Sequence, residues 1–329
     1  MKIDTTFLRS KVARRIFGLF VLCALLPIGA LAILSFRQVT NQLMAESQNR
    51  LRTATKAMGT AIFERLLLIE SQMKLMAPAV KGHGPAVQFR ATSVGENLAE
   101  RLAGVVLVPD AGSVVPVFGN VQEPPALTEA DRSYLASGRS LLTARPGPDG
   151  RARIFMSRAL DPEDPGRGIL IAEINTTYLW DIGEQGGWPP MTEFCVLDDS
   201  SRPLFCTANV LAAHLEQVAR SITGSAVGQL EWTDGGTEYL ARYSSIFLQP
   251  TFRVPKWTVI LSESRDEALA AVAEFKKTFP LVALLALWVV LLLSVSQIRR
   301  SLVPLEKLKE GTGRIAKREF DARVTVTSG

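Results

Sequence analysis

Residues 154–180 have the sequence IFMSRALDPEDPGRGILIAEINTTYLW, and this stretch decides the fold. Two runs rich in apolar and β-branched residues, 153–158 and 168–174, lie on either side of the acidic Pro/Gly loop 161–166. Such runs, bounded by turn residues, favour strands. A short helical piece follows at 176–180. We therefore expect an antiparallel strand pair that leads into a helix.

Short strands also occur on both sides of this stretch. Upstream, residues 109–112 join two strand-like runs, 104–108 and 114–118. Two successive antiparallel units predict a tandem α+β arrangement. Downstream, the second unit consists of strand-like runs at 193–197, 203–207, 228–232, 238–246 and 257–263, with a helix at 211–222.

A long helix precedes both units. From residue 37 to about residue 76, apolar residues recur every three or four positions, with Gly59 as the single glycine and no proline. This spacing predicts an amphipathic helix, which Pro78 and the Gly/Pro motif at 82–85 end. The apolar stripe needs cover from the chain's own domain, from a partner chain, or from both. We expect both, and hence a homodimer.

Two apolar blocks, 16–36 and 279–298, contain no charged residue. A helix of about 20 residues spans the roughly 30 Å hydrocarbon core of a bilayer, so each block predicts a transmembrane helix. A cleavable signal peptide is the alternative for the first block. The length of the run favours an uncleaved helix, because signal-peptide cores have about 7 to 15 apolar residues.

Basic residues lie before the first block and after the second. They outnumber Lys276 and Lys277, which lie between the two blocks. The positive-inside rule then predicts the cell inner membrane, with both termini in the cytoplasm and residues 37–278 outside. Because the basic residues cluster beside the apolar blocks, the net charge of +5 does not indicate nucleic acid as a partner. The flanking residues are Lys2, Arg9, Lys11, Arg14 and Arg15 before the first block, and Arg299, Arg300, Lys307 and Lys309 after the second.

Two cysteines, Cys195 and Cys206, lie in the segment expected outside the cytoplasm, where disulfides persist. A tight turn at residues 200–201 would place them opposite one another on neighbouring strands. We expect a disulfide, with two free buried thiols as the alternative.

The order of elements over residues 37–278 resembles the double Cache domain, in which two PAS-like modules stack on a long N-terminal helix. Residues 154–180 carry the likeness, together with the stretch from Glu238 through Phe252 to Leu261. The resemblance implies a cytoplasmic segment, a first span, a sensor domain, a second span and a relay segment. The expected boundaries are 1–15, 16–36, 37–278, 279–298 and 299–329, and the sensor divides into a stalk helix 37–84, a distal module 85–182, a proximal module 183–264 and a return helix 265–278.

Residues 299–329 resemble the first helix and connector of a HAMP domain. One departure is Arg318, which stands where the family usually has a connector glycine. A generic juxtamembrane amphipathic helix is the alternative. Because half a HAMP domain cannot complete its four-helix bundle, we expect a truncated chain whose output domain is missing. The residues expected to pack in this segment are Pro304, Leu305, Leu308, Ile315, Phe320, Val324 and Val326.

No catalytic or metal-binding motif is present in the sequence. The two histidines, His83 and His214, have no second ligand at metal spacing. The acidic residues 161–164 and 198–199 are better explained as turn residues. We expect no enzymatic activity, no metal and no cofactor.

The resemblance implies that the distal module 85–182 binds a small molecule. The family's amino-acid-binding motif is not matched, since the segment 132–134 lacks the aromatic pair, so no binding residue is carried over. Polar residues of the expected strands and their surroundings provide the candidates. For each of them, a structural role is the alternative, either exposed to solvent or satisfied within the core. They are Tyr134, Arg153, Ser157, Arg158 and Glu173.

These features predict a membrane-bound receptor that senses an extracytoplasmic small molecule and signals to a cytoplasmic partner or to an output domain beyond residue 329. One alternative is the regulatory half of a cyclic-di-GMP enzyme or histidine kinase. Another is a membrane scaffold that does not signal.

Overall fold

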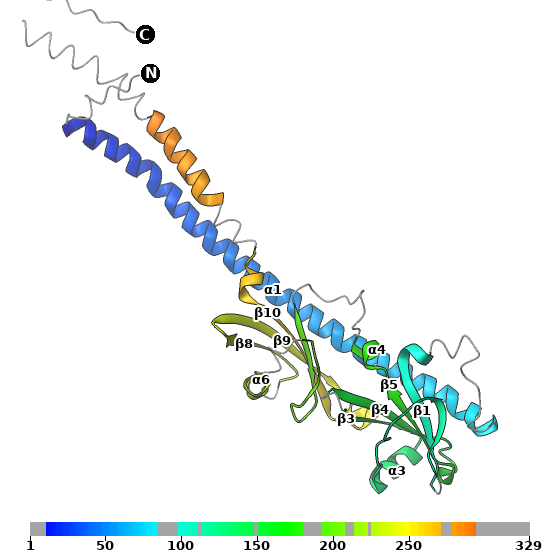
Figure 1. The fold of residues 1–329 in the computed structure, drawn as a ribbon. Helices are drawn as coiled ribbons and strands as arrows, with labels where there is room; N and C mark the ends of the chain where they lie inside the picture. The colour runs from blue at the N-terminus through cyan, green and yellow to red at the C-terminus, as the bar shows by residue number, and fades with distance from the viewer. Residues whose placement is uncertain are drawn as a thin grey trace, which may run out of the picture. The chain divides into compact units, whose positions relative to one another are not determined.

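The structure, a computed structural model, describes residues 11–83, 98–110, 113–147, 151–180, 192–207, 214–222, 225–270 and 278–293. The chain divides into two compact units. One comprises Ala45–Ala268, and the other comprises Met1–Met44 together with Leu269–Gly329. The first helix, α1 (Lys11–His83), belongs to both units, and Figure 1 shows it with the two sheets of the larger unit.

The two transmembrane helices of the predicted fold class are wrong. Block 16–36 lies within α1, and the described part of the second block lies within a helix over 278–293. Over the described ranges, no helix is both long and apolar enough to cross a membrane. The prediction rested on the length of the two runs and on their lack of charged residues, and these two features are not sufficient to establish a span. The predicted inner-membrane location stays a prediction.

The larger unit is α+β, with the long helix α1 and two five-stranded sheets. The first sheet has the order β2-β1-β5-β4-β3, and all of its strand pairs are antiparallel. In Figure 1 this sheet lies between α1 and α3. Its elements are β1 (Leu102–Val108), β2 (Val115–Gly119), α3 (Glu129–Ala136), β3 (Ser140–Pro146), β4 (Ala152–Ala159), η3 (Pro165–Arg167), β5 (Ile169–Ile174) and α4 (Thr176–Trp180).

The second sheet repeats the topology of the first, with the order β7-β6-β10-β9-β8 and antiparallel pairs throughout. In each sheet the last strand along the chain is the central one, as two copies of one module require. Its elements are β6 (Glu193–Leu197), β7 (Pro203–Cys206), α6 (Leu215–Ser221), β8 (Val227–Asp234), β9 (Thr237–Phe247), α7 (Gln249–Phe252), β10 (Lys256–Ser264) and α8 (Arg265–Ala268).

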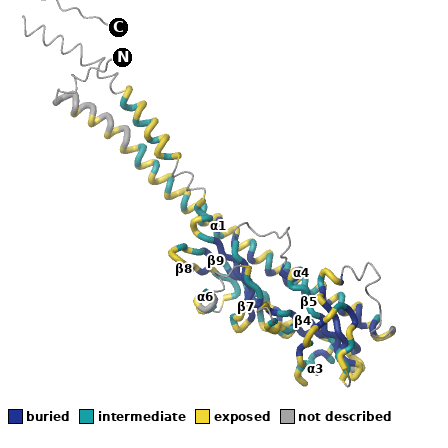
Figure 2. The backbone as a smooth tube through the Cα atoms, viewed as in Figure 1, coloured by how far each residue is buried: buried dark blue, intermediate teal, exposed yellow. Residues whose placement is uncertain are grey.

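The apolar stripe of α1 is buried in the larger unit. Figure 2 shows the buried positions concentrated in the two sheets and in the part of α1 that accompanies them. Burying side chains of this size stabilises the fold by about 1.5–3 kcal/mol each. The stripe residues that are at most 1% exposed are Leu51, Ile62, Leu66, Ile69 and Met73.

A disulfide joins Cys195 to Cys206, with 4.2 Å between their Cα atoms. The two residues are direct partners in the β6–β7 register. Asp198 builds the turn between these strands, since its carboxylate accepts from the backbone N–H of Ser200 at 2.9 Å and of Arg202 at 2.8 Å. Asp favours such positions because its short side chain reaches nearby backbone donors. The turn therefore holds the cysteines opposite each other.

The predicted HAMP segment 299–329 lies outside the described residues. This applies to all seven positions expected to pack there, namely Pro304, Leu305, Leu308, Ile315, Phe320, Val324 and Val326.

Candidate functional site

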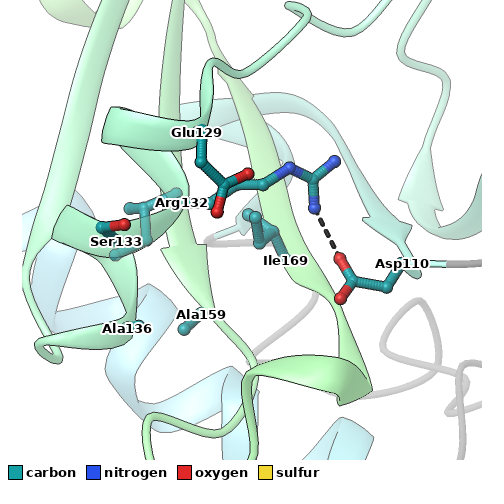
Figure 3. A pocket seen from close by; sticks show the side chains of 8 residues that line it. Asp110, Glu129, Arg132, Ser133, Ala136, Ala159 and Ile169 are labelled. Atoms are coloured by element: carbon teal, nitrogen blue, oxygen red, sulfur yellow. Dashed lines mark hydrogen bonds and ion pairs between the residues drawn. The ribbon is translucent and has the colours of Figure 1, made fainter.

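A cavity of about 420 Å³ lies in the first module, between α3 and the ends of β4 and β5 (Figure 3). Its size falls in the range of small-molecule sites. Polar groups and small or apolar side chains both contribute to its wall. The lining residues are Asp110, Glu129, Arg132, Ser133, Leu135, Ala136, Ala159 and Ile169.

Helix α3 supplies most of the lining, and its sequence fixes where it begins. The Thr128 side chain accepts from the backbone N–H of Asp131, and the Asp131 carboxylate accepts from the backbone N–H of Thr128. This capping box satisfies two of the amide donors that a helix N-terminus leaves unpaired. The pocket residues 129, 132, 133 and 136 then lie three or four positions apart, on one face of the helix.

The polar part of the wall carries both signs of charge. The Arg132 guanidinium lies 2.5 Å from the Asp110 carboxylate, which comes from the segment after β1 (Figure 3). Both side chains keep substantial solvent exposure, at 35% and 54%. A surface pair of this kind contributes little to stability. Its donors and acceptors therefore remain accessible to a ligand that carries charge.

The inner part of the wall is apolar and well packed. Leu135, Ala159 and Ile169 belong to the core cluster between the first sheet and α3. Ser157 lies two residues before Ala159 on β4, and alternate strand residues share a face. Its side chain is fully buried, and its Oγ has no hydrogen-bond partner in the described structure. A polar atom without a partner thus lies in the core next to the pocket.

Of the five sequence-predicted candidates, Arg153 and Glu173 bind each other. Arg153 Nε donates to Glu173 Oε1 at 2.7 Å, and a terminal nitrogen of Arg153 donates to Oε2 at 2.6 Å. The hydrogen bond to Glu173 raises the pKa of the Arg153 guanidinium above its ordinary value. Bidentate pairs of this geometry are among the stronger side-chain interactions. The two residues lie on adjacent strands, and each neutralises the charge of the other.

Arg158 lies on the opposite face of the first sheet, against α1. It approaches Glu70 of α1 at 3.9 Å and donates to the hydroxyl of Ser140 at 3.3 Å. Burial lowers the pKa of Arg158 below its ordinary value, and the nearby Glu70 carboxylate opposes that shift. This contact joins the sheet to the long helix.

Tyr134 lies on the face of α3 that points away from the pocket. Its hydroxyl donates to the backbone carbonyl of Thr251 in α7 at 3.4 Å. Its ring has the guanidinium of Arg253 5.2 Å from its centroid and that of Arg139 at 5.7 Å. None of the five candidates is a lining residue of the pocket. The structure instead provides Asp110 and Arg132, which the sequence reasoning missed. The capping box before Arg132 was the one signal that marked a helix there.

The matching face of the second sheet is filled by aromatic side chains. Trp232 stacks on Tyr239 with 4.1 Å between ring centroids, and the His214 ring lies 5.1 Å from Trp232. Burial raises the pKa of Tyr239, and the nearby carboxylates of Glu193 and Asp234 add to the effect. Because aromatic side chains fill this face of the second sheet, the first module offers the better ligand site.

The described residues contain no group of three or more potential metal ligands.

No protein-family model matches the chain. No curated protein matches it either.

Several solved sensory domains are similar to the chain in structure. The ligand-binding domain of the Pseudomonas aeruginosa amino acid chemoreceptor PctB, solved with L-Arg, is 12% identical, with a TM-score of 0.49 over 69% of this chain and 98% of that one. The extracellular domain of rpHK1S-Z16, assigned as a histidine kinase, is 19% identical, with a TM-score of 0.47 over 69% and 98%. The ligand-binding domain of the Campylobacter jejuni chemoreceptor Tlp3, solved with L-norvaline, is 15% identical, with a TM-score of 0.45 over 69% and 94%. Because these similarities are low, the basis for the function of this chain is its own pocket.

Proposed function

We propose that residues 45–268 form the sensor domain of a signal-transduction receptor and that the pocket beside α3 binds a small molecule. The observation that carries the proposal is the pairing of Arg132 with Asp110 at the wall of a cavity whose inner side is apolar. Ligand sites commonly combine a mostly apolar cavity with a few polar groups that orient the ligand.

The wall suits a compact molecule that carries both a negative and a positive group. Arg132 offers a planar set of donors that matches a carboxylate. Asp110 and Glu129 offer acceptors for an ammonium or other cationic group. Ala136 and Ala159 leave room beside Ile169 for an apolar substituent. Free amino acids and related zwitterions are the ligand class that fits this arrangement.

We place this domain outside the cytoplasm. The Cys195–Cys206 disulfide supports this location, because such bonds persist in oxidising compartments. The homodimer and the cytoplasmic partner or output domain belong to the same proposal. An output that is a cyclic-di-nucleotide enzyme or a histidine kinase would use the same sensor domain.

The test is a ligand screen on the purified full-length chain. The twenty L-amino acids and a set of carboxylate metabolites are screened by thermal shift, and each compound that raises the melting temperature is titrated by calorimetry. Arg132→Ala should weaken binding of that compound at least about tenfold, because a charge-assisted hydrogen bond contributes about 1.5–3 kcal/mol. Arg132→Lys should lose less.

Arg145→Ala is the matched control, since Arg145 is exposed on β3 and does not line the pocket. It should bind like the parent chain. A screen without a single binding compound would favour the scaffold interpretation, and equal losses for Arg132→Ala and Arg145→Ala would remove this pocket from consideration.

A further inference from the structure

Two opposite faces of helix α3 make different contacts: one lines the pocket, and the other contacts the second module. Residues 129, 132, 133 and 136 line the pocket. Ala130, Asp131 and Tyr134 lie on the other side of the helix and contact residues 251 and 253. A short helix with a ligand on one face transmits any displacement to whatever packs on its other face, because packed interiors deform little.

Arg253 forms most of this contact. One of its terminal nitrogens donates to the backbone carbonyl of Ala130 at 2.7 Å and to the Asp131 carboxylate at 3.2 Å. The same guanidinium lies over the Tyr134 ring, 5.2 Å from its centroid. The backbone of Arg253 has a φ of 60° and ends α7 in the left-handed conformation. A non-glycine residue rarely adopts this conformation, so the side-chain contacts are made from a strained backbone position.

The recipient element, α7, also contacts the long helix. Phe252 is fully buried and packs edge-on against Phe63 of α1, with 6.4 Å between ring centroids. Three residues after Arg253, the chain enters β10, the central strand of the second sheet. Near the end of β10, the buried Glu263 accepts from the Ser47 hydroxyl and from Arg50 of α1, the latter at 2.5 Å.

We propose that the Tyr134–Arg253 contact couples pocket occupancy in the first module to α7, β10 and α1 in the second. The proposal rests on the proposed function, since it assigns a regulatory output to the same pocket. A molecule bound against residues 132 and 133 shifts α3, and Arg253 passes the shift to α7. Phe252 and β10 then carry it to α1 at two separate places.

A competing route leads through α4. This helix follows β5, and Trp180 at its end lies 5.7 Å from Trp257 of β10 and 5.9 Å from Phe205 of β7, measured between ring centroids. A change at Ile169 would reach the second sheet by this route without Arg253. The experiment therefore has to separate the two routes.

The test uses a covalent occupant, so that it does not depend on the natural ligand. In a full-length Cys23→Ser background, which leaves only the disulfide-bonded cysteines, Ser133→Cys is labelled with an aminoethyl methanethiosulfonate reagent. Ser133 is exposed and lines the pocket. Hydrogen exchange is then compared with and without the label over residues 249–264. The label should change exchange there at least about threefold.

Arg253→Gly is the disrupting variant, because glycine adopts the left-handed conformation without strain and removes only the side chain. It should reduce the change over 249–264 to less than half, while the change over 159–169 beside the pocket persists. If this variant does not fold, Tyr134→Ala takes its place. Arg145→Cys, labelled in the same way on an exposed site outside the pocket, should leave 249–264 unchanged.

An undiminished response in Arg253→Gly would overturn the proposal in favour of the Trp180 route. The proposal would also be overturned if the label on Ser133→Cys, with Arg253 intact, changed hydrogen exchange clearly over 159–169 but not over 249–264. Failure of the ligand screen would instead bear on the proposed function, because the tethered label occupies the pocket whether or not a natural ligand exists.

Discussion

Loss of the Cys195–Cys206 bridge should destabilise the second sheet by about 3 kcal/mol. The two cysteines are 11 positions apart in the chain. In the chain-entropy model, opening a loop of this length returns about 9 cal/mol/K to the unfolded chain, which is about 3 kcal/mol at 25 °C. The effect should concentrate on β7, because this four-residue edge strand pairs with β6 alone.

The assay compares three states of the full-length chain: oxidised, reduced, and the Cys195→Ala/Cys206→Ala variant. Urea unfolding gives the free energy of unfolding, and hydrogen exchange of β7, compared with that of β6 and β10, reports where in the second sheet the loss occurs. Reduction opens the bridge without replacing a side chain, so it measures the loop-closure contribution to stability alone. The double variant should lose somewhat more, because Cys195 is fully buried and alanine leaves a small void. Cys23→Ser is the control, since Cys23 is a free, exposed cysteine. Equal stability of the oxidised and reduced chains, within about 0.5 kcal/mol of extrapolation error, would refute the loop-closure argument.

Three further substitutions test the fold and the site. Gly168→Ala should cost about 1–3 kcal/mol in urea unfolding, because Gly168 has a φ of +101° and an added Cβ would lie 2.6 Å from the Val108 carbonyl oxygen. Asp161→Asn should lower the melting temperature near pH 7, and the difference from the parent chain should shrink as the pH falls below the usual aspartate range. The hydrogen bond from Lys81 holds the pKa of Asp161 below its usual value, so its stabilisation is complete above the unfolded pKa and is lost as the pH falls through the folded one. Arg158→Ala should lower the melting temperature yet leave the affinity for any compound found in the ligand screen within about twofold, because its side chain faces α1 and distant sites act independently.

Most of the sheet architecture could be predicted from the sequence. The strands around the loop 161–166 and those around the cysteines follow from apolar runs bounded by turn residues. Placing Cys195 opposite Cys206 required only the turn position, since a turn fixes the register of a hairpin. Local patterns were sufficient for the β4–β5 and β6–β7 pairs, whose strands are neighbours in the chain and have turn residues between them.

The candidate site could not be predicted, because its parts meet only in the folded chain. Arg132 and Asp110 are 22 positions apart, and Ala159 and Ile169 come from later strands. Polarity along a strand nominated Arg153 and Glu173, whose charges the register between β4 and β5 brings together. Polarity alone does not show whether the charge of a strand residue is paired with that of its cross-strand neighbour, and here the pairing became visible only in the folded chain.

Helix α3 and strand β3 were also missed by the sequence reasoning. The eight residues of α3 are too few for a helical period to be recognised, and they give only the Thr128 cap as a local signal. The strand Ser140–Pro146 has three buried residues followed by exposed ones, not an alternation. Helix α3 depends on packing against the first sheet, and β3 depends on pairing with β4 at the edge of that sheet. Such tertiary contacts override weak local preference.

A comparison of the side chains on the two sheets supports the choice of the first module as the ligand site. They share one strand order, so corresponding positions can be compared. The inner face of the first sheet carries Ser157 and Ala159 beside the pocket, whereas the matching face of the second sheet carries Trp232, Tyr239 and Tyr243. A buried aromatic side chain covers about 150–250 Å², so the second module fills with tyrosine and tryptophan the space that small side chains leave open in the first. The same fold thus has a face filled with aromatic side chains in one copy and a pocket in the other, and this difference favours the first module as the ligand site.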